Sequence, residues 1–165
     1  MLFALLGAFM FASKQVMEPF PNVHMLGMLT VLYTLLFRVK ALIPIYIFIL
    51  LEGILCGFNV WWVPYLYLWP ILFGLAMLIP RNKNPFLVSA LCAVVCSLHG
   101  FLYGTLYAPY QALMFNLTFK GTVAWIIAGI PFDIVHGISN FFMGLLVYPL
   151  YVPMKRVIGK FQNLK

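Results

Sequence analysis

Six long apolar stretches, separated by short breaks that carry most of the charges, dominate this sequence. They run from about Leu2 to Met17, Val23 to Phe37, Ala41 to Phe58, Pro64 to Pro80, Pro85 to Tyr107 and Gly121 to Tyr151. Apolar residues follow one another without strict alternation, which indicates helices and excludes the strands of a membrane barrel. Hydrophobic residues make up 65% of the 165 residues, more than a soluble domain of this size can bury. The sequence therefore predicts an all-α integral membrane protein, a compact bundle of six transmembrane helices forming one domain over residues 1–165.

The basic residues predict how the bundle is oriented. Eight of the ten fall in the second and fourth turns and near the C-terminal end: Arg38, Lys40, Arg81, Lys83, Lys155, Arg156, Lys160 and Lys165. The other turns hold Lys120 alone, and Lys14 lies inside the first stretch. Cytoplasmic loops are enriched in Lys and Arg, so both termini are expected in the cytoplasm and the chain is expected to be a multi-pass protein of the plasma membrane. The net charge of +7 then reflects orientation, and no nucleic-acid partner is expected.

A polar face in the sixth stretch is the main candidate for function. Asp133, His136 and Asn140 stand at i, i+3 and i+7 in an apolar segment, which places them on one side of a helix. We interpret this face as one wall of a ligand site in the outer half of the membrane. The alternative is that Asp133, just after Pro131, only complements the start of a helix.

Two irregular regions are predicted around this face. Residues 108–120 lack a clear pattern and are expected to form an irregular connection. Pro131 removes a backbone donor, so a kink or break is expected near residues 128–131. Either one kinked helix runs on from Gly121, or a short helix ends near Ala128 and a new one begins at Pro131.

Other polar and aromatic residues are expected to complete the site. Glu52 lies in the middle of the third stretch, where a carboxylate must face the interior, a partner or a ligand. His99 lies in an otherwise apolar part of the fifth stretch. The residues predicted to wall or cover the site are Asn59, Trp61, Trp62, Tyr65 and Tyr103. Each has an alternative. Glu52 could be a carboxyl group hydrogen-bonded within the bundle, and His99 an interior histidine whose hydrogen bonds are satisfied there. The aromatic residues could form a belt at the membrane surface.

Small residues on the first stretch predict a helix contact. Ala4, Ala8 and Ala12 recur every four residues and form a flat groove that another helix can approach closely. The alternative is packing inside the bundle, which is also the expectation for Gly100-x-x-x-Gly104.

No metal or cofactor is expected. Asp, Glu and His are possible ligand types, but the sequence lacks the spacings typical of zinc sites. Two other kinds of function stay open. One is a small intramembrane enzyme that uses Asp133, His136 and His99 as acid, base or metal ligands. The other is a stand-alone small-molecule carrier or a structural bundle.

The number of stretches, the predicted orientation and the alanine groove together resemble the substrate-binding S component of energy-coupling factor (ECF) vitamin transporters. The segments that carry this resemblance are Ala4–Ala12, Lys40–Tyr46, Trp61–Tyr65 and Gly129–Asn140. It covers essentially the whole chain.

The resemblance implies a division of labour. An S component captures a vitamin or related micronutrient from outside, while a transmembrane coupling subunit and two ATP-binding cassette ATPases supply the energy. The groove of Ala4, Ala8 and Ala12 would meet the coupling subunit. The chain itself has no Walker motif, so ATP hydrolysis is expected in partners and not here. The candidate carboxylates favour a neutral or cationic heterocycle, such as thiamine, over a multiply charged anion.

Overall fold

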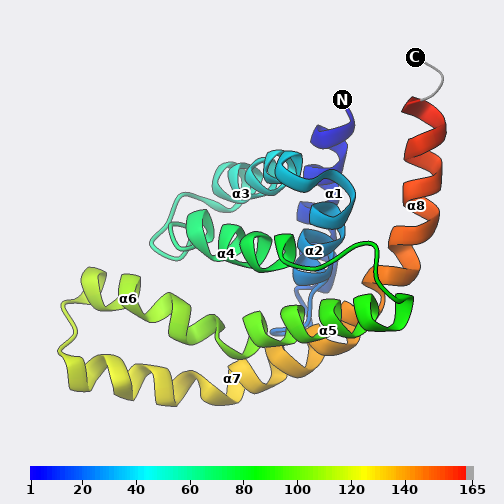
Figure 1. Cartoon of the computed structure of the whole chain (residues 1–165). Helices are drawn as coiled ribbons and strands as arrows, with labels where there is room; N and C mark the ends of the chain where they lie inside the picture. Colours follow the sequence, from blue (N-terminus) through cyan, green and yellow to red (C-terminus); the bar gives the residue numbers. More distant parts are fainter. Residues whose placement is uncertain (163–165) are drawn as a thin grey trace.

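The structure is a computed structural model that describes residues 1–162, and these residues form eight α-helices and one 3-10 helix. The elements are α1 (Leu2–Met17), α2 (Leu26–Phe37), η1 (Arg38–Ala41), α3 (Leu42–Cys56), α4 (Tyr65–Met77), α5 (Pro85–Phe101), α6 (Tyr103–Phe115), α7 (Phe119–Leu145) and α8 (Val147–Gln162). Helix α5 packs along α7, α1 on α3, and α2 against α4. Figure 1 shows α3 to α7 running in similar directions across the molecule, with α1 and α2 crossing them and α8 extending away from the body.

Helix α2 forms the centre of the protein. Every residue from Leu26 to Leu35 is buried, as expected for a helix that is apolar on all sides. Large side chains of its neighbours, such as Phe48 on α3 and Trp69 on α4, are buried with it in one core. A polar residue that faces this core is therefore withdrawn from solvent.

The apolar stretches predicted from the sequence are all helical. Three helical stretches are long and apolar enough to cross a membrane: Leu26–Cys56, which joins α2, η1 and α3; Pro85–Phe115, which joins α5 and α6; and Phe119–Leu145, which is α7. The apolar helices α1 and α4 are shorter. This confirms the all-helical prediction and is compatible with a membrane protein.

One detail of the predicted organisation is wrong. Residues 108–120 are not irregular, because α6 continues to Phe115 and α7 begins at Phe119. Of the two alternatives at Pro131, the single helix is correct and the break is not, because Pro131 lies inside the continuous helix α7 and is exposed on its surface. Packing of α7 along α5 and α6 holds the helix across the one hydrogen bond that proline removes. The sixth stretch divides at Leu146, which lies between the end of α7 and the start of α8.

Helices α5 and α7 approach closely because glycines stand at their crossing. A Cβ atom added at Gly100 would lie 2.8 Å from both the Gly137 Cα and the His136 carbonyl oxygen. These are backbone atoms on the facing helix, so they cannot swing away as a side chain could. The crossing confirms that Gly100 packs inside the bundle, and it fixes the position of His136.

Gly100→Ala is accordingly expected to lower the free energy of unfolding by about 1–3 kcal/mol, the usual cost of overpacking. The measurement is thermal or denaturant unfolding of the purified protein in detergent. Gly74→Ala is the matched control, because a Cβ at Gly74 has nothing within 4 Å and should leave α4 unchanged or slightly more stable. Equal stability of the two variants would contradict the close crossing.

Candidate ligand-binding site

Five aromatic rings, including all three histidines of the chain, meet at the centre of the helices. The His136 ring lies 4.7 Å from that of His24 and 4.9 Å from that of Tyr103, measured between ring centroids. The Trp69 ring lies 6.0 Å from His24, 5.7 Å from His99 and 6.3 Å from Tyr103. These residues come from the α1–α2 connection and from α4, α5, α6 and α7. We call this group the five-ring cluster.

Hydrogen bonds to backbone carbonyl oxygens hold two parts of the cluster in place. His99 Nε2 lies 3.0 Å from the Leu68 carbonyl oxygen, which joins α5 to α4. The Ser139 hydroxyl donates to the Asn22 carbonyl oxygen at 2.9 Å and so fastens the α1–α2 connection to α7. This contact brings His24 over His136. Burial lowers the pKa of His24, in that connection, to about 4, so its ring is neutral at pH 7.

The cluster carries buried polar atoms that have no hydrogen-bond partner among residues 1–162. They are His24 Nδ1, Trp69 Nε1, His99 Nδ1, His136 Nε2 and both side-chain amide atoms of Asn140. Asn140 is fully buried one helical turn beyond His136 on α7. An unpaired buried polar atom costs about 1–3 kcal/mol, and proteins rarely leave several together. Such a concentration is typical of a binding site.

A buried ion pair lies beside the cluster. Lys14 Nζ donates to Glu52 Oε2 at 2.7 Å, and the Glu52 side chain is completely buried. The same ammonium lies 5.6 Å from the centroid of the Trp61 ring and 6.0 Å from that of Tyr65. The Tyr65 ring in turn lies 5.8 Å from that of Trp69. The ion pair is thereby joined to the five-ring cluster through aromatic contacts.

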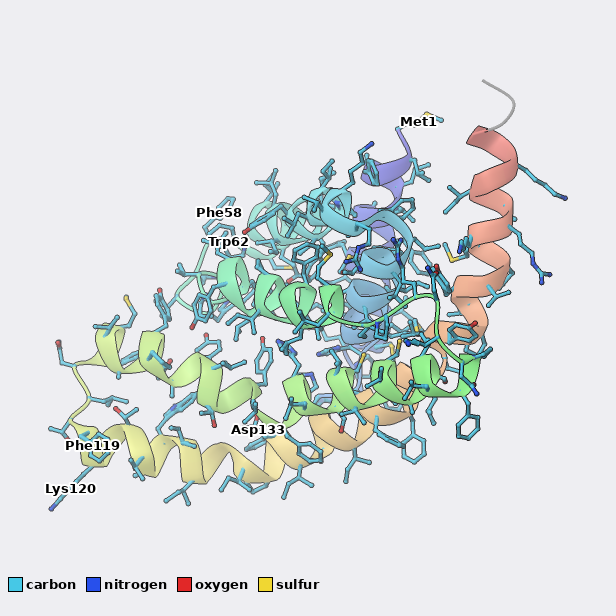
Figure 2. All side chains as sticks on the ribbon, in the orientation of Figure 1. Met1, Phe58, Trp62, Phe119, Lys120 and Asp133 are labelled. Atoms are coloured by element: carbon cyan, nitrogen blue, oxygen red, sulfur yellow. The ribbon has the colours of Figure 1, made fainter. Side chains whose placement is uncertain are left out.

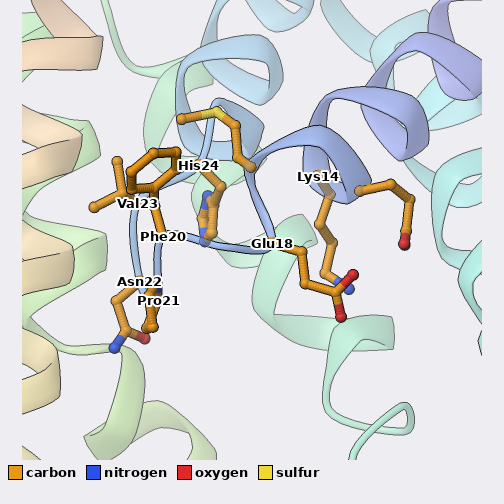
Figure 3. Close-up of a pocket in the computed structure, with 9 residues that line it drawn as sticks. Lys14, Glu18, Phe20, Pro21, Asn22, Val23 and His24 are labelled. Carbon is orange, nitrogen blue, oxygen red and sulfur yellow. The ribbon is translucent and has the colours of Figure 1, made fainter.

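A cavity of about 170 Å³ opens between the end of α1 and the α1–α2 connection. Its lining includes Lys14, Glu18 and His24, which Figure 3 shows around the opening. The cavity touches the five-ring cluster at His24 and the ion pair at Lys14. The other four rings of the cluster do not line it.

The structure brings together most of the residues that the sequence analysis singled out. His99, Tyr103 and His136 are members of the cluster, Asn140 is its neighbour, and Glu52, Trp61 and Tyr65 surround Lys14. Glu52 therefore faces the interior and a partner within the chain.

Two residues predicted to cover the site lie elsewhere. Asn59 is exposed, and its amide nitrogen lies 3.5 Å from the Cys56 carbonyl oxygen. The Trp62 indole donates to the Ile49 carbonyl oxygen at 2.7 Å and packs edge-on against Phe58, whose ring centroid is 4.9 Å away. Figure 2 shows Phe58 and Trp62 together at the α3–α4 connection. Trp62 thus fastens this connection to α3 and is not free to stack on a ligand.

Asp133 caps a helix, but not its own. Both carboxylate oxygens accept from the Gly104 amide, at 3.0 and 3.2 Å, at the start of α6. Figure 2 shows Asp133 on α7 near this point. The positive end of the α6 dipole explains the negative charge here. The predicted alternative, that Asp133 complements the start of a helix, is therefore correct, but the helix is α6 and not the one that carries Asp133.

Asp133→Leu is expected to lower the free energy of unfolding by about 1–2 kcal/mol, the cost of losing an N-terminal cap. Asp133→Asn keeps an acceptor and should cost less. Unfolding in detergent measures both effects, and binding by Asp133→Asn should match that of the unaltered protein. Loss of binding without loss of stability would instead make Asp133 a ligand contact.

Three residues of the site escaped the sequence analysis. His24, Lys14 and Trp69 were not assigned to it, although the chain has only three histidines. A lysine and a glutamate in separate apolar stretches are a signal for Lys14, because two opposite charges in membrane helices tend to pair. His24 gave no such local signal, since its neighbours in space come from α4 and α7.

The alanines of α1 lie on the outside of the protein. Ala4, Ala8 and Ala12 are all exposed, whereas Gly7 and Met10 of the same helix are buried. A Cβ atom at Gly7 would lie 2.9 Å from the Pro44 carbonyl oxygen of α3, so this opposite side makes the internal contact. The alternative that the alanines pack inside the bundle is wrong.

No group of three His, Cys, Asp or Glu side chains within residues 1–162 is placed to hold a metal ion. Comparison with protein-family models, curated proteins and solved structures found no match to this chain.

Proposed function

We propose that the protein captures a small molecule from outside the cell within the membrane and acts as the S component of an ECF-type importer. The observation that carries this proposal is the buried set of unpaired polar atoms around the five-ring cluster. A bound ligand would supply hydrogen-bond partners for these atoms.

The proposed membrane arrangement agrees with the charges and the fold. The α3–α4 and α6–α7 connections lie at one end of the molecule in Figure 1, and the α4–α5 connection lies at the other. The latter carries Arg81 and Lys83, so the positive-inside rule assigns that end to the cytoplasm. In the proposed arrangement α3 to α7 run from one side of the plasma membrane to the other, and the positions of the basic residues favour both termini inside.

The outward face of α1 is a suitable contact surface for the proposed coupling subunit. Its alanines are exposed, and α3, which packs on α1, has an open apolar groove of about 430 Å³ on its own surface. Leu42, Ile43, Tyr46, Ile47 and Leu50 line this groove. A transmembrane helix of the coupling subunit fits a small-residue face and an apolar groove on neighbouring helices. The two ATPases of such an importer would then act through that subunit.

The test combines binding with uptake. Purified protein is titrated with thiamine, riboflavin, pyridoxine, biotin and nicotinamide, and the tightest binder is followed as a radiolabelled compound in cells. Submicromolar binding, with uptake that requires an ECF coupling subunit and its ATPases, is the expected result. Uptake without those partners would instead support a stand-alone carrier. Chemical change of the bound compound by the purified protein would support an enzyme.

A further inference from the structure

We infer that α8 lies along the cytoplasmic surface of the membrane and binds anionic phospholipid headgroups there. The inference depends on the proposed membrane orientation but on no property of the ligand site, so it can fail while the capture function stands.

Helix α8 lies at the end of the molecule that the basic residues assign to the cytoplasm. Figure 1 shows α8 running crosswise to α3 to α7, at the end where the α4–α5 connection lies. Helix α5 begins at Pro85, directly after that connection with Arg81 and Lys83, and it contacts α8. Among the helices of residues 1–162, α8 is not one of those apolar enough to cross a membrane. A helix of this direction and composition is expected to follow the membrane surface.

The first half of α8 is fastened to the protein, and its second half is more open. Val147 and Tyr151 are buried in the core, and the helix contacts α2 and α5. Met154 and Ile158 continue the same side of the helix, at seven and eleven residues from Val147, but they are only partly buried. The apolar side of α8 therefore continues beyond the part that the protein covers fully.

A second apolar strip of α8 faces away from the protein. Leu150 and Val157 are both exposed, and their spacing of seven residues places them on one face of the helix. Interfacial helices bury such a face at the boundary between headgroups and acyl chains. At the membrane end of this molecule, acyl chains are the apolar material available to cover it.

The basic residues of α8 have no counter-charge in the protein. Arg156 and Lys160 are exposed and stand four residues apart, on one face of the helix. No Asp or Glu follows Asp133 in the sequence, and the one ion pair within residues 1–162 joins Lys14 to Glu52. Anionic headgroups supply the missing charge, and each Lys or Arg close to an anionic membrane surface strengthens the attraction.

The arginines of the shorter connections differ from Arg156 in this respect. Arg38 donates to the Met77 carbonyl oxygen at 3.0 Å, and Arg81 donates to the Leu35 carbonyl oxygen at 3.2 Å. Both guanidinium groups hold helix ends together. The side chain of Arg156 makes no hydrogen bond to any other described residue, so it is free to bind a phosphate group.

Fluorescence quenching tests the position of α8. Full-length protein with Cys56→Ser and Val157→Cys is labelled with bimane, since Cys92 and Cys96 are buried. It is then placed in nanodiscs of equal parts phosphatidylcholine and phosphatidylglycerol. The label should be quenched by doxyl-labelled lipid and shielded from aqueous iodide. The same label at Asn82→Cys, in the exposed α4–α5 connection, is the matched control and should stay accessible to iodide.

Two results would overturn the surface position. One is equal access of iodide to the labels at positions 157 and 82. The other is shielding of the Val157→Cys label only after an ECF coupling subunit and its ATPases are added, which would assign this face to a protein partner.

A titration in detergent tests the charge requirement. The Val157→Cys label is followed while dioctanoyl phosphatidylglycerol, dioctanoyl phosphatidylcholine or inorganic phosphate is added. Only phosphatidylglycerol should change the signal, and Arg156→Gln or Lys160→Gln should each raise its half-maximal concentration about fivefold. Lys120→Gln, at the far end of α7, is the matched control and should not. Equal values in all three variants, or the same response to inorganic phosphate, would refute binding of anionic lipid by α8.

Discussion

Lys14→Met is expected to lower the free energy of unfolding by about 3–5 kcal/mol, the cost of leaving one member of a buried ion pair alone. Glu52 is completely buried and Lys14 is its partner at 2.7 Å, so the substitution leaves a carboxylate in an apolar interior. Unfolding in detergent, followed by tryptophan fluorescence or by aggregation on heating, measures the loss. Lys120→Met removes an exposed lysine and should change stability little.

The double variant Lys14→Met/Glu52→Gln separates this effect from simple loss of packing. Replacing both charges removes the unpaired carboxylate, and apolar or neutral replacement of a buried pair is often close to neutral. The double variant should therefore be more stable than Lys14→Met alone. Should it prove equally unstable or worse, the aliphatic part of Lys14 matters more than its charge, and the ion-pair account fails.

Ala8→Leu is expected to abolish coupled uptake while leaving ligand binding intact. The larger side chain fills the flat outward face of α1, where a partner helix needs close backbone approach. Ala8 is exposed, so the substitution creates no clash within the chain. Two measurements test this: co-purification of the variant with the ECF coupling subunit, which should be lost, and ligand binding by the isolated variant, which should be kept.

Ala128→Leu is the matched control for this experiment. Ala128 is also exposed on a helix, but it lies on α7 and away from the groove of α1 and α3. It should keep both co-purification and binding. If Ala8→Leu and Ala128→Leu behave alike, the alanine face of α1 has no special part in coupling.

Apolar continuity was enough to predict the helices, because chain segments of this composition satisfy their backbone groups only as helices in an apolar setting. The local signals failed for residues 108–120, which were predicted to be irregular, and could not choose between a continuous and a broken helix at Pro131, which stands inside α7. A proline predicts a break only when nothing else holds the helix, and here the α5–α7 and α6–α7 contacts do so. Tertiary packing decided these boundaries.

The candidate site was predictable in its residue types more than in its geometry. His136 and Asn140 were recognisable because polar groups are rare in such a stretch. Their partners were not, because the His24–His136 contact depends on the close glycine crossing of α5 and α7 and on the Ser139–Asn22 hydrogen bond. Neither contact leaves a periodic signal in the sequence.

Helix α1 carries both the exposed alanines and the lysine of the buried ion pair. Its exposed alanines begin at Ala4, and Lys14 stands ten residues later, about 15 Å along the axis. Because the helix is continuous from Leu2 to Met17, a shift of its outer face also moves the ammonium group beneath Trp61 and Tyr65. Any free energy that links the two ends acts equally in both directions. Under the proposed function, a coupling subunit that tilts α1 would weaken ligand binding by the same factor by which the ligand opposes that tilt.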